Sequence, residues 1–248
     1  MEKGAGRLQT VVRKVIGPIF NRLFDLTIIG MEHLPATGPA IIAANHTSVI
    51  DSFIVPAILP RNISYVGKAE YLDDWKTKHI FPALGMIPID RSGGDAAMAA
   101  LDTAASLLDR GQLFGIYPEG TRSRTGHLYK GRTGVARLSH RTGAPIVPTG
   151  LMGMRGIQPP DAPMPKLFTK ATIAFGEPLQ PDEQGDPAVD PLAFRAMTDE
   201  LMFRIQHLSG QHYIHRYAPS KAELEERIDV TSDRPLDDRR TATDLLNA

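Results

Sequence analysis

The segment at positions 45–51 reads NHTSVID, so that His46 precedes Asp51 by five residues. A carboxylate bound to one ring nitrogen fixes the tautomer of a histidine and leaves the other nitrogen free to take a proton. On a regular helix, five residues turn through about 500°, which would point these side chains about 140° apart. The two can therefore meet only if a turn comes first, with Thr47 or Ser48 near the helix N-cap. The segment predicts a general base oriented by a carboxylate; the alternative is a histidine that only hydrogen-bonds to the next helix.

A second segment, at positions 117–124, reads YPEGTRSR and opens a loop with four basic residues and one acid up to position 133. Gly120 permits close approach of the backbone, while Thr121 and Arg122 supply a hydroxyl and a planar fork of donors. This composition predicts an anion site, and phosphate is the anion that it favours. The neighbouring Glu119 would orient Arg122 rather than act as an acid. The alternative is a solvated loop.

A third segment, at positions 87–94, reads IPIDRSGG. An arginine after a strand, followed by a glycine pair that opens a helix, can also hold an anion. Arg91 is therefore a candidate anion ligand. On these residues alone, a structural turn formed by Asp90 and Arg91 is the better interpretation.

The elements that must position these segments alternate between strand and helix patterns. The sequence predicts strands at 26–29, 40–44, 63–66, 86–89, 113–117, 146–149 and 172–175, and helices at 50–59, 96–108, 134–140 and 192–208. This alternation predicts an α/β fold: a single domain with a mostly parallel central sheet flanked by helices. Each chemical segment follows a predicted strand, and ligands of open α/β sheets bind at the carboxyl ends of strands.

The two ends of the chain differ from this domain, which we place at residues 25–218. Residues 1–24 predict amphipathic helices, with Pro18 kinking or splitting the segment. Residues 219–248 predict an acidic, poorly ordered tail, and the proline-rich stretch 158–166 predicts irregular structure. The apolar stripe of the N-terminal segment comprises Leu8, Val11, Val12, Val15, Ile16, Ile19, Phe20 and Leu23. Basic residues interleave with it, so the segment either packs on the domain or lies in a membrane interface.

The 248 residues balance 28 basic against 28 acidic side chains, but the balance is uneven along the chain. Residues 1–150 carry 17 basic and 12 acidic side chains, a net charge of +5, and the remainder carries −5. The first half can therefore face anionic partners. The absence of cysteine excludes disulfides and thiolate chemistry, and no run of 18 apolar residues predicts a membrane span. We see no metal-ligand cluster and no nucleic-acid motif, and a secretory signal is not expected.

Taken in order, these segments resemble the glycerophospholipid acyltransferase family, which includes the lysophosphatidic acid acyltransferases. The matching blocks are NHTSVID, GMIPIDRSGG, YPEGTRS and PIVPTG, and the resemblance covers about residues 25 to 215. It implies transfer of a fatty acyl group from a thioester donor, acyl-CoA or acyl carrier protein, to the free hydroxyl of lysophosphatidic acid. In this interpretation His46 is the general base and Asp51 orients it, without a covalent acyl-enzyme, a metal or a cofactor.

The resemblance also implies which residues bind the acceptor phosphate. These are Glu119, Gly120, Thr121 and Arg122, with Arg91, Lys68 in the VGKAEY segment and Arg137 on the following helix as further candidates. Since several relatives span the membrane and this chain has no predicted span, residues 1–24 become the expected anchor. We therefore expect a peripheral protein on the cytoplasmic face of the cell membrane.

Three alternatives stay open at this point. The same chemistry could act on glycerol-3-phosphate or another lysophospholipid. The protein could instead bind lipid without catalysis, although retention of both His46 and Asp51 argues against this. A hydrolase with a serine nucleophile is disfavoured because no G-x-S-x-G motif is present.

Overall fold

A computed structural model of the chain describes residues 7–68, 85–89, 96–181, 191–220 and 223–224. The chain divides into two units, Met1–Tyr217 and Ala218–Ala248. Everything below concerns the first unit. The acidic tail predicted for 219–248 lies almost wholly outside the described residues.

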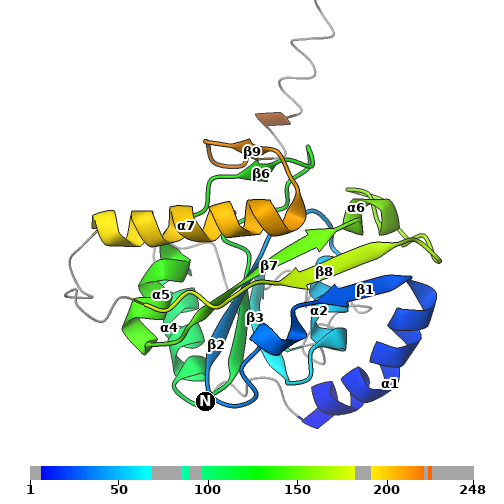
Figure 1. The fold of residues 1–248 in the computed structure, drawn as a ribbon, viewed down its shortest axis with the longest axis horizontal. Helices are drawn as coiled ribbons and strands as arrows, with labels where there is room; N and C mark the ends of the chain where they lie inside the picture. Colours follow the sequence, from blue (N-terminus) through cyan, green and yellow to red (C-terminus); the bar gives the residue numbers. More distant parts are fainter. Residues whose placement is uncertain (1–6, 69–84, 90–95, 182–190, 221–222, 225–248) are drawn as a thin grey trace, which may run out of the picture. The chain divides into compact units, whose positions relative to one another are not determined.

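Seven strands form the central sheet in the order β1-β8-β7-β2-β5-β3-β4 (Figure 1). Every pairing in this sheet is parallel except that of β7 with β8. This confirms the predicted α/β fold with a mostly parallel sheet. The strands are β1 (Leu26–Ile29), β2 (Ala40–Ala44), β3 (Ile63–Lys68), β4 (Met86–Ile89), β5 (Leu113–Ile116), β7 (Ile146–Met152) and β8 (Ala171–Phe175).

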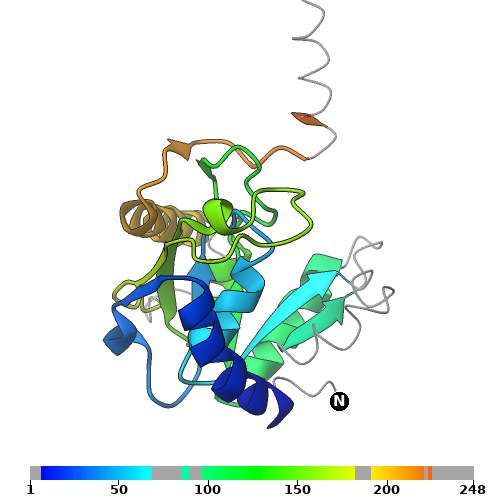
Figure 2. The same cartoon turned by 90° about the vertical axis from the view of Figure 1, so that its right-hand side faces the viewer.

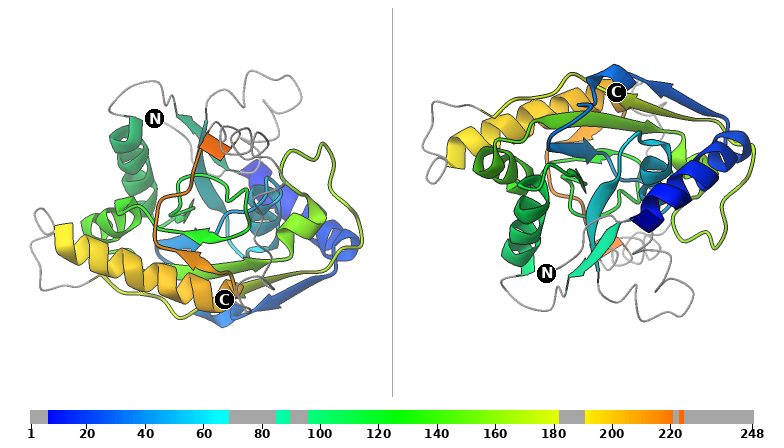
Figure 3. Two further views of the ribbon diagram at one scale, coloured as in Figure 1. Left: turned by 90° about the horizontal axis from the view of Figure 1, so that it is seen from above. Right: turned by 90° about the horizontal axis from the view of Figure 1, so that it is seen from below.

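Helices cover both faces of this sheet, as the fully buried AIIAA sequence of β2 requires (Figure 3). One face packs against α1 (Arg7–Leu23) and α2 (Asp51–Ile58), whose apolar side chains share a core with β2 and β8. The other face packs against α4 (Ala96–Leu108), α5 (Gly134–Thr142) and α7 (Pro191–Ser209). The result is a three-layer sandwich with two apolar cores.

Helix α1 packs along α2 (Figure 2). It is one helix that continues through Pro18, so the segment is not split there, and the predicted kink stays a prediction. Phe20 and Leu23 pack on the core, whereas Val11, Val15 and Ile19 face outward. The side chains of Leu8, Val12 and Ile16 lie outside the described residues. No helix within the described ranges is long and apolar enough to cross a membrane.

Several short elements were not predicted. They are η1 (Met31–His33), α6 (Met154–Ile157), and the strands β6 (Leu128–Tyr129) and β9 (Tyr213–Ile214), which pair in a second, two-stranded sheet. The main sheet nevertheless brings the chemical segments to one edge. Ala43 of β2 pairs with Ile116 of β5, so the chain leaves both strands side by side just before His46 and Glu119.

Candidate active site

His46 and Asp51 meet directly after β2. The Nδ1 atom of His46 lies 2.9 Å from Oδ2 of Asp51, and the carboxylate is completely buried while the imidazole is 14% exposed. Because a carboxylate only accepts hydrogen bonds, Nδ1 carries the proton and Nε2 is the basic nitrogen. Nε2 makes no hydrogen bond within the described part of the chain. The structure thus brings the predicted pair together and leaves one ring nitrogen available.

The pair can form because the first residues after β2 are a turn and α2 begins only at Asp51. Oδ2 of Asp51 also accepts the backbone N–H groups of Thr47 at 2.8 Å and Ser48 at 2.9 Å. Three donors therefore converge on one carboxylate oxygen and hold the carboxylate in place. The helix N-cap is Ile50, not Thr47 or Ser48 as predicted; the carboxylate of the first helical residue binds the preceding turn instead.

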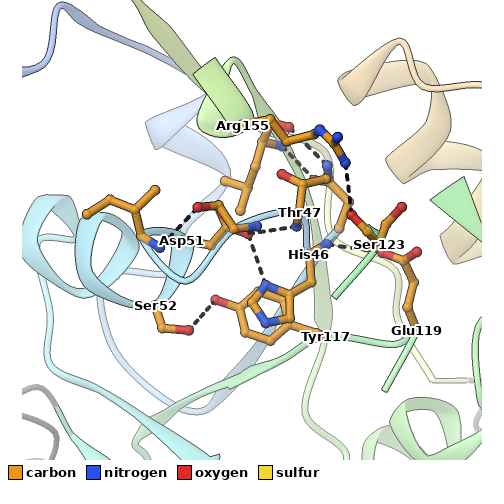
Figure 4. Close-up of polar contacts among 12 residues, drawn as sticks. His46, Thr47, Asp51, Ser52, Tyr117, Glu119, Ser123 and Arg155 are labelled. Atoms are coloured by element: carbon orange, nitrogen blue, oxygen red, sulfur yellow. Dashed lines mark hydrogen bonds and ion pairs between the residues drawn. The ribbon is translucent and has the colours of Figure 1, made fainter. Parts of the chain in front are cut away.

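The ring of Tyr117 stacks against the imidazole of His46 (Figure 4). It lies parallel to that of His46, with centroids 3.8 Å apart and planes 9° from parallel, and the ring of Tyr65 also stacks on Tyr117, with centroids 6.1 Å apart. The phenol hydroxyl shares a hydrogen bond of 3.1 Å with Oγ of Ser52. Burial, together with Tyr65 and Asp51, raises the pKa of Tyr117 well above its ordinary value. The phenol is therefore protonated over the whole working pH range.

Glu119 has a different place from the one predicted. Its carboxylate is buried, with Oε1 accepting the N–H of His46 at 3.0 Å and Oε2 accepting the N–H of Tyr129 at 3.0 Å. Burial raises its pKa to about 7, although both backbone N–H groups oppose the shift. No ion pair with Arg122 occurs in the described ranges. Glu119 therefore fixes the backbone of His46, and its assignment to the acceptor phosphate stays a prediction.

The rest of the EGTR segment faces outward. Gly120 and Thr121 are exposed, and Arg122 is half-buried with no side-chain hydrogen bond or ion pair to any described residue. Gly120 has φ +76°, and a Cβ there would come within 2.8 Å of Nε of Arg132, so glycine is required for this turn. The next residue, Ser123, donates its N–H to the carbonyl of His46 at 2.7 Å. Arg122 therefore lies on a loop that is bonded to the backbone of His46.

Residues that follow β7 in the sequence bind the outer side of this loop. Arg155, in α6, donates to the carbonyls of Ser123 at 3.3 Å and Arg124 at 2.6 Å (Figure 4). Arg124 pairs with Asp161, so its charge is already matched. Of the four basic residues counted in this loop, Arg122 is the one next to His46 whose guanidinium is not engaged by a described residue. The others pack elsewhere, since Lys130 and Arg132 lie over the ring of Tyr217.

Three candidate phosphate ligands remain, and the structure describes them to different extents. Lys68 ends β3, two strands from β2 at the same edge, but its side chain lies outside the described residues. Arg91 also lies outside them. Arg137 is exposed on α5 with its guanidinium 5.5 Å from the ring of Phe194 in α7. In the structure Arg137 contacts the neighbouring helix, and its assignment to the acceptor phosphate stays a prediction.

Some residues that shape the site were not predicted. Asn45 is fully buried, and its amide exchanges two hydrogen bonds with the backbone of Leu151, at 2.9 and 2.7 Å, which ties the end of β2 to β7. Its Nδ2 also donates to Gln211, which in turn donates to the carbonyl of Gly126. An asparagine directly after a buried strand was the available signal, since a buried amide must find partners.

Comparisons with known proteins identify the family of the chain. The Acyltransferase family model matches residues 25–152. A 1-acyl-sn-glycerol-3-phosphate acyltransferase of Bacillus subtilis is 30% identical over 189 residues, covering 74% of this chain and 88% of that protein. A chloroplastic enzyme of the same name from Arabidopsis thaliana is 28% identical, and the match covers 55% of this chain but only 38% of the relative.

The fold has a solved counterpart as well. The crystal structure of the 1-acyl-sn-glycerophosphate acyltransferase PlsC from Thermotoga maritima superposes with a TM-score of 0.64 at 22% identity. The superposition covers 81% of this chain and 79% of that one. Family match, relatives and fold converge on one conclusion: the chain belongs to the glycerophospholipid acyltransferase family and is an acyltransferase.

Proposed function

We propose that this enzyme is a 1-acylglycerol-3-phosphate acyltransferase, which acylates lysophosphatidate to phosphatidate with acyl-CoA or acyl carrier protein as thioester donor. The observation that carries the proposal is the His46–Asp51 pair at one sheet edge, next to a loop whose Arg122 has no hydrogen bond or ion pair to a described residue. The names of the Bacillus and Arabidopsis relatives support lysophosphatidate as acceptor.

The chemistry follows from the free Nε2 of His46. This nitrogen takes the proton of the acceptor hydroxyl while the hydroxyl oxygen attacks the thioester carbonyl. The new ester C–O bond forms, the C–S bond breaks, and the thiolate takes the proton back from the imidazolium. Asp51 stabilises the imidazolium during these steps and holds the ring in one tautomer. The nucleophile belongs to the substrate, so the reaction proceeds without an acyl-enzyme, and the proposal includes no cofactor.

The acceptor phosphate is assigned to the outward side of the EGTR loop. Arg122 supplies a planar, permanently charged fork, and the exposed Thr121 supplies a hydroxyl. Lys68 and Arg91 remain candidates because their strands end at the same edge. The proposal also includes a peripheral position on the cytoplasmic face of the membrane, with residues 1–24 as anchor. The exposed apolar and basic side chains of α1 support it.

The decisive experiment is a matrix of donors against acceptors with the purified full chain. We expect phosphatidate from lysophosphatidate, abolished in His46→Ala and retained in the matched control His207→Ala, an exposed histidine on α7. Turnover only with glycerol-3-phosphate or another lysophospholipid would overturn the acceptor. Lipid binding without any turnover, unchanged by His46→Ala, would overturn the enzymatic proposal in favour of a lipid-binding protein.

A further inference from the structure

Exposed apolar side chains gather on two segments that lie far apart in the sequence. In the described part of the chain, eleven large apolar side chains are exposed, and six of these belong to α1 or to the loop after α6. The six are Val11, Val15, Ile19, Met164, Leu167 and Phe168. Scattered apolar residues are ordinary on a protein surface, but such a concentration marks an interaction site.

Helix α1 keeps its apolar row outward because two of its polar side chains, Gln9 and Arg13, are bound to the domain. The amide of Gln9 donates to the carbonyl of Ile63 at 2.8 Å and accepts the backbone N–H of the same residue at 3.1 Å. The guanidinium of Arg13 donates to the carbonyl of Leu59 at 2.9 Å. These contacts fix the rotation of the helix about its axis. The fold therefore fixes the outward orientation of this apolar row.

The loop presents Phe168 in a backbone conformation that aromatic residues rarely adopt. Its φ is +58°, in the left-handed region, and the residue is 76% exposed. Such strain persists only where neighbouring contacts hold it, and it concentrates at functional positions. Here the N–H of Phe168 donates to the carbonyl of Leu23 at 2.6 Å, and the N–H of Ala171 donates to Asp25 at 3.1 Å. The backbone is fixed to the end of α1 while the side chain stays in solvent.

These contacts join the loop to the C-terminal end of α1. The outward row of α1 advances in steps of four residues, and the next step reaches Leu23, which binds Phe168. Residues 7–25 and 164–170 together contain six basic residues and one acid. Lys14, Arg22, Lys166 and Lys170 are exposed. The apolar surface is thus framed by positive charge.

We propose that the six apolar residues, here called the docking surface, rest on a lipid bilayer that carries anionic head groups. The inference rests on the proposed function and extends it, because the loop at 164–168 becomes a second contact besides the N-terminal helix. Apolar side chains enter the interface, and the surrounding ammonium and guanidinium groups meet the head groups. Two contacts fix the orientation of the enzyme on the membrane, which one helix alone does not.

The same loop connects the docking surface with the catalytic turn. At its start, Oγ of Ser48 donates to the carbonyl of Gln158 at 2.7 Å, and the N–H of Ser48 donates to Asp51. One continuous segment therefore runs from the His46 turn to Phe168.

The test is sedimentation of the full chain with vesicles of phosphatidylcholine, with and without phosphatidylglycerol. Phe168→Asn removes the ring and keeps the backbone conformation, because asparagine tolerates positive φ. We expect roughly tenfold weaker binding to the anionic vesicles, given the apolar area of one phenylalanine. Ile19→Asn should weaken binding similarly. The matched control is Phe203→Asn on α7, where a phenylalanine is 64% exposed outside the docking surface, and it should bind like the parent.

Equal vesicle binding by Phe168→Asn and Phe203→Asn would overturn the proposal. Light scattering provides a second test: a parent that self-associates through Phe168 and ignores vesicles would identify the surface as an interface between copies. Turnover of a short-chain, water-soluble lysophosphatidate separates this inference from the proposed function. Phe168→Asn should match the parent there, whereas a parent inactive on that substrate would contradict the function and leave the vesicle result standing.

Discussion

The imidazole of His46 lies flat against the phenol of Tyr117, at a centroid distance of 3.8 Å. Asp51 fixes one atom of the imidazole, but a single hydrogen bond leaves the ring free to pivot about it. The stacked phenol removes that freedom, and the bond from Tyr117 to Ser52 holds the phenol in turn. Two contacts therefore set the direction in which Nε2 points: the hydrogen bond to Asp51 and the stack on Tyr117.

The stack predicts that Tyr117→Leu lowers kcat by up to about tenfold, because aromatic pairs contribute about 0.5–1.5 kcal/mol beyond their burial. KM for the acceptor should change little, since Tyr117 is assigned no contact with the phosphate. Tyr117→Phe is the matched control: it keeps the stack, loses only the bond to Ser52, and should stay within about threefold of the parent. Equal losses in both variants would show that the hydroxyl, and not the ring, positions His46.

Asp51→Asn tests the charge of the carboxylate separately from its geometry. The amide oxygen can still accept the N–H groups of Thr47 and Ser48, so the turn before α2 should be retained. The imidazolium formed during transfer loses its counter-charge, and we expect kcat to fall about 10²- to 10⁴-fold, as for general acid–base catalysis. Asp102→Asn, on the exposed face of α4, is the control. Activity within tenfold of the parent would remove Asp51 from the mechanism.

Glu119 predicts a pH dependence of stability. Burial raises its pKa from 4.5 to about 7 in the folded state, so between these values the folded protein keeps a proton that the unfolded chain has released. The free energy of unfolding should therefore fall as pH rises through this window, by roughly 3 kcal/mol at full effect. Urea unfolding across the window measures the slope.

Two variants identify the group responsible for that slope. Glu119→Gln cannot titrate and should lose the Glu119 contribution, although it is less stable overall because one backbone N–H of His46 or Tyr129 loses its acceptor. Glu200→Gln, exposed on α7, should retain the slope of the parent. A slope that survives in Glu119→Gln would assign the titration to another group.

Local patterns predicted the parts of the site that depend on local structure. The His46–Asp51 pair needs only a strand, a turn and a helix start, all visible in seven residues. The role of Glu119 was not visible, because one of its partners is a backbone N–H 73 residues earlier. Since a backbone N–H does not depend on the type of its residue, the sequence does not indicate which residue donates it. The stack on Tyr117 escaped prediction for a similar reason, since it depends on the pairing of β2 with β5.

The N-terminal segment shows the same limit of sequence-based prediction for a whole helix. Periodicity predicted an amphipathic helix, and α1 is present, but the pattern could not show which face meets the domain. Gln9 and Arg13 bind backbone carbonyls near β3, and these polar contacts hold an apolar row toward solvent. The usual rule that the apolar face packs inward therefore fails for Val11, Val15 and Ile19.

Arg122 carries the last prediction, which concerns the acceptor. If its guanidinium binds the phosphate, Arg122→Ala should raise KM for lysophosphatidate roughly tenfold to a hundredfold, the value of a charge-assisted hydrogen bond, with a smaller effect on kcat. Arg122→Lys should recover part of the loss, because a point charge replaces the planar fork. The matched control Arg141→Ala removes an exposed arginine of α5 that pairs with Asp102.

A phosphate-free acceptor distinguishes this contact from a general effect on the loop. With a monoacylglycerol as acceptor, the parent and Arg122→Ala should show the same KM, since the guanidinium has no anion to bind. If Arg122→Ala raised KM for both acceptors alike, the side chain would be shaping the loop next to Ser123 instead of binding phosphate. The phosphate site would then have to be sought at Lys68 and Arg91, whose strands end at the same edge of the sheet.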